Sequence, residues 1–241
     1  MALVQAWGSG TVGSTGLFNT TSNTVTLNTG QTFNGSNAVI ILEERFGGAV
    51  TEYITGITVA GTACSPLAQG GDLVTEYQAA KANIWWCAAN AGVSDAVVIT
   101  WSAAAGQKAG FISVLEWSGV TGLDTGCENY SLASLVNPTC STLASTTTTN
   151  TLLVSVFGNG DAGTPTISGP TDGGTWTVIG KISSGATYDC GGTAYFVDTS
   201  AAATKTGTWG STGGSVTTAT CIAAFKLATA GSKTLMMLGV G

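Results

Sequence analysis

The fold class follows from the stretch Asn37-Ala38-Val39-Ile40-Ile41-Leu42. Its apolar residues follow one another without a helical period, and the acidic pair Glu43-Glu44 ends the run. A continuous apolar run of this length, rich in β-branched residues, is typical of a strand that is buried on both faces. A similar run, Asn150-Thr151-Leu152-Leu153-Val154, occurs 113 residues further along. We therefore expect two buried strands of the same kind, one in each half of the chain.

The sequence after these two runs also repeats in a constant order. At a shift of 108 residues, Trp101 aligns with Trp209 and Trp117 aligns with Phe225. Each half contains an apolar strand, a Gly-rich passage, an aromatic strand, a Thr–Trp strand and a closing strand. Several matches in one order indicate an internal repeat of about 110 residues.

Strand signals continue along the whole chain. Runs rich in Thr and Val are separated by Gly, Asn, Asp and Ser at intervals of about 8–12 residues, and we find no amphipathic helical segment. The pattern predicts an all-β protein, an antiparallel jelly-roll-like β-sandwich built from two similar halves. We expect one shared core, because the link at 141–149 has no Pro or Gly hinge. Two tandem small sandwiches are the alternative.

Composition divides the chain into three parts. Residues 1–22 form a Gly-rich arm, residues 23–227 form the sandwich with repeats at 37–120 and 150–226, and residues 228–241 form an apolar tail. An exposed apolar tail favours aggregation, so we expect it to be covered by its own sandwich or by a neighbouring copy. The residues that we expect at an assembly contact are Trp7, Leu235, Met236, Met237, Leu238 and Val240.

Ionised side chains are rare in this sequence. Only 8% of the 241 residues are charged, against about a quarter in an average domain, and histidine is absent. Without imidazole, Ser–His and Cys–His catalysis are excluded, and we expect no cofactor and no enzyme activity. The net charge of −6 argues against nucleic-acid binding, which needs clustered Lys and Arg. We expect no membrane span and no signal peptide.

Two other kinds of chemical site can be tested against the sequence. Glu43 and Glu116 would form a glycosidase pair if they faced one groove on adjacent strands. Glu43 lies at a strand end and the repeat does not keep Glu116, so we expect no such site. Clustered oxygens at 158–163 and at 172–174 could hold calcium. The Asn-Gly and Asp-Gly pairs in these segments are equally typical of turns, so we assign no metal.

The cysteines suggest disulfides. They are Cys64, Cys87, Cys127, Cys140, Cys190 and Cys221. None has the spacing of a zinc site, and we favour bridges between neighbours in sequence, which are Cys64–Cys87, Cys127–Cys140 and Cys190–Cys221. Buried thiols are the alternative. Disulfides would place the mature protein in an oxidising space.

The tryptophans could serve as sugar-binding platforms or as core residues. Trp85 and Trp86 point to opposite faces of one strand, so we expect at least one of them in the core. The equivalent positions of Trp101 and Trp209 favour packing. Trp7 and Trp176 lie outside the aligned strands, so both are candidates for an exposed contact.

Several motifs together resemble a poorly characterised β-sandwich module of phage virion proteins and secreted bacterial surface proteins. The motifs are Asn150-Thr-Leu-Leu-Val-Ser-Val, Thr193-Ala-Tyr-Phe-Val, Thr206-Gly-Thr-Trp209 and Cys221-Ile-Ala-Ala-Phe-Lys226. The resemblance covers residues 37–226 and implies a jelly-roll-like sandwich with a structural or adhesive role. It transfers no catalytic residues.

These observations predict a viral structural protein, such as a phage capsid decoration, head-fibre or tail-surface component. It would act in the virion by binding copies of itself or a capsid or tail protein. A glycan-binding module, or a subunit of an extracellular filament at the cell surface, is the alternative.

Overall fold

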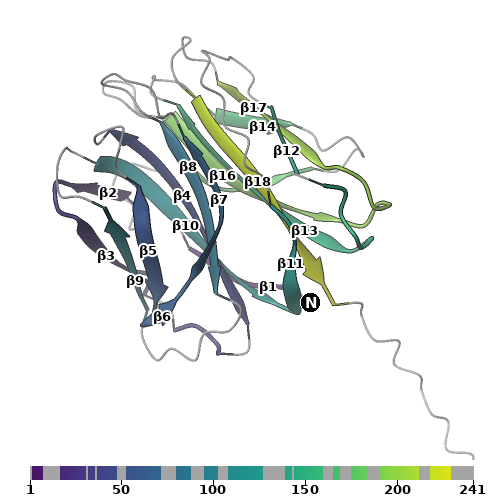
Figure 1. Cartoon of the computed structure of the whole chain (residues 1–241), viewed down its shortest axis with the longest axis horizontal. Helices are drawn as coiled ribbons and strands as arrows, with labels where there is room; N and C mark the ends of the chain where they lie inside the picture. Colours follow the sequence, from purple (N-terminus) through teal and green to yellow (C-terminus); the bar gives the residue numbers. More distant parts are fainter. Residues whose placement is uncertain are drawn as a thin grey trace, which may run out of the picture.

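Strands and their connecting loops make up the described part of the computed structural model (Figure 1). The structure describes residues 2–7, 17–30, 32–35, 37–47, 53–71, 80–87, 95–102, 108–126, 139–142, 144–159, 165–168, 175–183, 190–211 and 218–228. In these ranges no segment forms a helix that is long and apolar enough to cross a membrane. The prediction of an all-β, antiparallel fold is confirmed.

The first half of the chain forms two antiparallel sheets, A and B. Sheet A has the order β1 (Ala2–Trp7), β10 (Lys108–Ser118), β4 (Ala38–Gly47), β8 (Lys81–Cys87) and β7 (Ser65–Gly71), and β2 (Leu17–Thr20) also pairs with β10. Sheet B has the order β3 (Thr24–Asn28), β9 (Ala96–Trp101), β5 (Ile54–Val59) and β6 (Thr62–Ala63).

The second half forms sheets C and D. Sheet C has the order β11 (Val120–Thr125), β18 (Thr218–Leu227), β13 (Thr151–Asn159), β16 (Cys190–Asp198) and β15 (Thr177–Ser183). Sheet D has the order β12 (Thr139–Ser141), β17 (Thr206–Ser211) and β14 (Pro165–Ser168).

Each half has the strand order of a jelly roll. If β1 and β2, which both pair with β10, count as one strand, and β6 and β7 count as one strand that bends at Cys64, the first half has eight strands. In sheet A the first of these pairs with the last, and the third lies between the last and the sixth. Sheet C repeats this order strand for strand, from β11 to β15, and sheet D repeats the order of β3, β9 and β5. We call the two halves roll 1 (sheets A and B) and roll 2 (sheets C and D).

The strand order corrects two expectations about the halves. Each half supplies both sheets of its own sandwich, rather than one sheet of a common sandwich. The link between the halves is Gly119, which alone separates β10 from β11, and not the segment 141–149. Within the expected Gly-rich arm, residues 1–22, the strands β1 and β2 pair with β10 in sheet A.

The four sheets stack in the order B, A, C, D, so that sheets A and C meet in the middle (Figure 1). One apolar cluster lies between sheets A and B and includes Ile57, Ile99 and Trp101. A larger cluster extends from sheet A through sheet C to Trp209 of sheet D. The two rolls therefore share a core although each closes its own sandwich.

The apolar run quoted first is buried on both faces, as predicted. Val39 and Ile41 belong to the cluster against sheet B, whereas Ile40 and Leu42 belong to the cluster against sheet C, and all four are fully buried. Only a strand in a middle layer needs apolar residues at every position. The neighbouring strand β8 has the same property, which explains why Trp85 packs toward sheet B and Trp86 toward sheet C.

Candidate functional site

The two carboxylates proposed as a glycosidase pair lie too far apart for that chemistry. Glu43 and Glu116 share one face of sheet A, on neighbouring strands, but Glu116 is opposite Val39 and Glu43 is opposite Ile112. Four residues along the strand and one interstrand spacing separate the two groups by about 14 Å. Glycosidase carboxylates lie roughly 5–9.5 Å apart. The pair is therefore not formed.

Each of these carboxylates instead holds a buried polar contact. The Asn83 amide donates a hydrogen bond to Glu43, and both residues are buried in the layer between sheets A and B. Glu116 Oε1 accepts hydrogen bonds from the backbone N–H of Asn34, at 2.9 Å, and from Asn37 Nδ2, at 2.6 Å. A buried carboxylate needs such donors to offset its desolvation. Glu116 thus anchors the segment before β4 onto sheet A.

The disulfide prediction is confirmed for one pair and wrong for another. Cys64 and Cys87 form a disulfide, with a Cα–Cα distance of 4.5 Å. Cys190 is opposite Asn159 and Cys221 is opposite Val156, on the two sides of β13. The intervening strand and the offset place their Cα atoms well beyond the roughly 7 Å that a disulfide spans.

The other cysteines leave one pairing untested. Cys127 lies outside the described residues, so the pairing with Cys140 stays a prediction. The side chains of Cys140 and Cys221 are buried.

The remaining sequence candidates are mostly not brought together. Trp176, expected to be exposed, is 6% exposed because its ring packs against Phe196 at 6.0 Å. Trp7 lies in β1, but its side chain is outside the described residues, as is the apolar tail with Leu235, Met236, Met237, Leu238 and Val240. Of the calcium candidates at 158–163 and 172–174, Gly158 and Asn159 lie in β13, and the other residues are outside the described ranges. Within the described ranges, no three potential metal ligands cluster.

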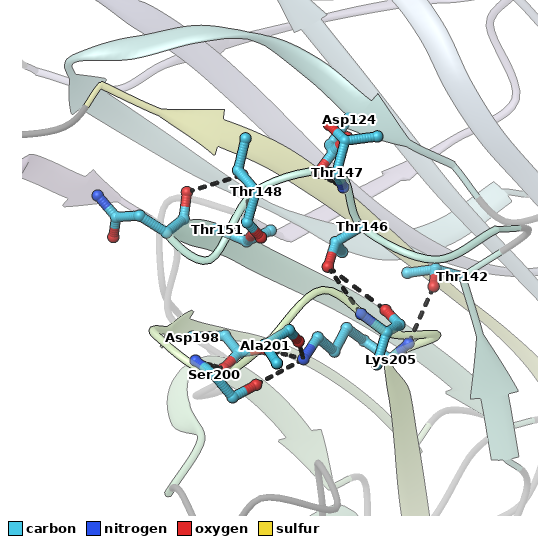
Figure 2. Close-up of polar contacts among 12 residues, drawn as sticks. Asp124, Thr142, Thr146, Thr147, Thr148, Thr151, Asp198, Ser200, Ala201 and Lys205 are labelled. Carbon is cyan, nitrogen blue, oxygen red and sulfur yellow. Dashed lines mark hydrogen bonds and ion pairs between the residues drawn. The ribbon is translucent and has the colours of Figure 1, made fainter.

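The best-defined polar site was not predicted from the sequence. Asp198, at the end of β16, and Lys205, just before β17, form an ion pair of 2.7 Å whose side chains are 3% and 1% exposed. The short loop between these two strands folds over the pair, as Figure 2 shows. Lys205 Nζ also donates hydrogen bonds to Ser200 Oγ, at 2.6 Å, and to the Ala201 carbonyl, at 2.9 Å. The ammonium thus has two hydrogen-bond acceptors and one carboxylate oxygen within 2.9 Å.

Opposing effects act on the Asp198 carboxyl. Burial raises its pKa, but hydrogen bonds from Lys205 and Ser200 and the charge of Lys205 outweigh burial, so its pKa lies below the ordinary value of 3.8. The carboxylate is therefore ionised at neutral pH. A buried ammonium that is paired with a carboxylate stays protonated and is neither a base nor a nucleophile, so this arrangement is suited to closing the roll.

A threonine-rich segment continues the network from this ion pair. The Thr142 hydroxyl accepts a hydrogen bond from the Lys205 backbone N–H, at 3.0 Å, and Thr146 contacts the backbone of Ala203 (Figure 2). Asp124 then accepts hydrogen bonds from the N–H and the hydroxyl of Thr147, at 2.8 and 2.6 Å. These contacts tie the loop before β13 to the loop before β17. They fix one end of roll 2.

The outward faces of the two outer sheets form the second candidate site. On sheet B the outward residues are Thr24, Thr26, Asn28, Thr55, Thr58, Ala63, Ala96, Val98 and Thr100. On sheet D the described ones are Thr139, Ser141, Thr206, Thr208 and Gly210. No ionised side chain occurs among these described outward residues. In their described parts, the outward faces of sheets B and D therefore carry neutral residues, many of them threonine.

No family model matches this chain, and no curated protein and no solved structure matches it either.

Proposed function

We propose that this protein is a structural component of an assembly, most simply a virion, built through the outer faces of its jelly rolls. The observation that carries this proposal is the absence of ionised groups from the described outward residues of sheets B and D. Charged residues on an exposed sheet oppose the stacking of one copy on another, and this chain lacks them there. The resemblance to phage virion modules and the low overall charge support the same reading.

The edges of the central sheets argue against assembly by edge-to-edge pairing. The edge strands β1, β7, β11 and β15 of sheets A and C contain a register shift against their neighbour, whereas the short edge strand β2 pairs with β10 without one. Such irregularities twist an edge away from a partner strand. The strands β3, β12 and β14 of the outer sheets pair without a shift. We therefore place the contacts at the outer layers.

The experiment is sedimentation velocity over a range of concentrations, combined with electron microscopy of the concentrated protein. We expect species larger than a dimer, and we expect Thr26→Lys and Thr206→Lys to abolish them, because each places a charge on an outward face. Thr149→Lys is the matched control, since Thr149 is exposed in a loop. A monomer at every concentration, with no binding to a capsid or tail protein, contradicts the proposal.

One observation favours the glycan-binding alternative. Tyr53, next to β5, is 58% exposed at the border of the outward face of sheet B. An exposed ring beside threonine hydroxyls could stack on a sugar. Binding on a glycan array that is lost in Tyr53→Ala and kept in Thr149→Lys would support this alternative over assembly.

A further inference from the structure

The contacts between sheets A and C are reciprocal. Strand β18 of roll 2 lies against β7 of roll 1. The counterpart of β18 in roll 1 is β10, the counterpart of β7 in roll 2 is β15, and these two strands also lie against each other. Reciprocity of this kind is the mark of an isologous interface, in which two copies of one surface meet.

The ladder registers assign counterparts residue by residue. Trp117 is opposite Ala38 in roll 1, and Phe225 is opposite Leu152 in roll 2. Continuing across β4 and β13 makes Trp86 the counterpart of Tyr195. The sequence alignment, with its constant shift of 108 residues, makes Ala194 the counterpart of Trp86 instead. Ala194 faces the other side of sheet C, because a slip of one residue reverses every side chain of a strand.

Two ring pairs between the rolls exchange places under this assignment. The Trp117 ring packs against Tyr195 with centroids 5.3 Å apart, and the Phe225 ring packs against Trp86 with centroids 5.6 Å apart. Since Trp117 corresponds to Phe225 and Tyr195 corresponds to Trp86, these are the same contact made twice. A buried hydrogen bond of 2.6 Å between the hydroxyls of Ser113 and Thr193 lies in the same interface.

The covalent connection between the rolls is a single glycine. Gly119 has a φ of +77°, a conformation that side chains with a Cβ disfavour. It joins β10, the last strand of roll 1 in sheet A, directly to β11, the first strand of roll 2 in sheet C. If this residue were extended, roll 1 would be free to meet roll 2 of another copy with the same contacts. Only the hinge would then differ between the two forms.

We propose that the interface between sheets A and C is an isologous dimer interface retained in one chain, through which two copies of this protein can exchange rolls. The partner is a second copy, and each copy supplies roll 1 to roll 2 of the other. The inference rests on the self-assembly of the proposed function but uses different surfaces. Lysine at Thr26 or Thr206 leaves exchange unchanged, and a hinge substitution leaves the outer faces unchanged, so the two proposals can fail separately.

The test substitutes the hinge in the full chain. Gly119→Val makes the closed hinge unfavourable by about tenfold, and a dimer contains two hinges, so we expect about a hundredfold rise in the dimer association constant by sedimentation velocity. Gly30→Val is the matched control, because Gly30 also has a positive φ, +72°, and open space around it but lies in a loop of roll 1. An unchanged association constant overturns the proposal.

A cross-linking experiment identifies the exchange itself. A chain with Ser113→Cys is co-expressed with a chain carrying Thr193→Cys, both with Gly119→Val. A disulfide between these positions then joins two different chains, and mass spectrometry of the linked peptides detects it. Dimers without this cross-link overturn the proposal. If Gly119→Val does not fold, the same pair is examined with the natural hinge at high concentration, where absence of the cross-link has the same consequence.

Discussion

Breaking the Cys64–Cys87 disulfide should weaken roll 1 and leave roll 2 intact. Cys64 lies at the bend between β6 and β7, where the chain crosses from sheet B to sheet A, and Cys87 ends β8. The bridge therefore clamps the crossing strand to its neighbour. The registers place Trp176 and Phe196 at the corresponding positions of roll 2, where two rings in contact take the place of the bridge.

The expected magnitude follows from the length of chain that the bridge closes. The two cysteines are 23 residues apart in sequence. In the chain-entropy account, closing a loop of this size stabilises the folded protein by about 3.4 kcal/mol. For a chain of this size, that loss lowers the midpoint of thermal unfolding by roughly 7–14 °C.

The assay is thermal and urea unfolding of the double variant Cys64→Ala/Cys87→Ala, which leaves the other cysteines unchanged. Hydrogen exchange then locates the effect. We expect faster exchange in β5 to β9 and unchanged exchange in β15 to β18, since only roll 1 loses its clamp. A loss below about 1 kcal/mol, or equal acceleration in both rolls, would refute the reasoning.

Two further predictions concern roll 2. In Gly192→Ala the new Cβ would lie 2.5 Å from Cζ3 of the fully buried Trp209. We therefore expect the free energy of unfolding, measured in urea, to fall by about 1–3 kcal/mol. Gly56→Ala is the control, because a Cβ at Gly56 meets open space and should change this free energy little. The lowered pKa of Asp198 stabilises the folded state above about pH 4, and this contribution should disappear as the pH falls below 3.8 and through the lower folded pKa. Asp198→Asn should therefore be several kcal/mol less stable than the natural protein at pH 7, because Lys205 loses its partner. Between pH 4 and 2 the variant should lose less stability than the natural protein does. An unchanged acid dependence contradicts this.

The predictable part of the fold depended on local signals. The run at 38–42 indicated a strand buried on both faces, because strand character depends on consecutive residues. Cys64 and Cys87 indicated their bridge, because they follow one another in the order of the cysteines and a disulfide between them closes a short loop. The ion pair of Asp198 and Lys205 had no such signal. A lysine is normally exposed, and only the closure of the loop over it shows that it is buried. Trp176 was wrongly expected to be exposed for the same reason, since its ring packs against Phe196, which belongs to the distant strand β16.

The amino-acid sequence by itself determined that this is a β protein with few charges and an internal repeat. Those properties depend on residue type and local order, which need no partner to be recognised. Only the tertiary structure decided that each repeat is a complete jelly roll, that Gly119 joins the rolls, and that sheets A and C meet. The reason is that strand pairing is a contact between distant segments, and a shift of one residue in a register reverses which face of the strand is buried.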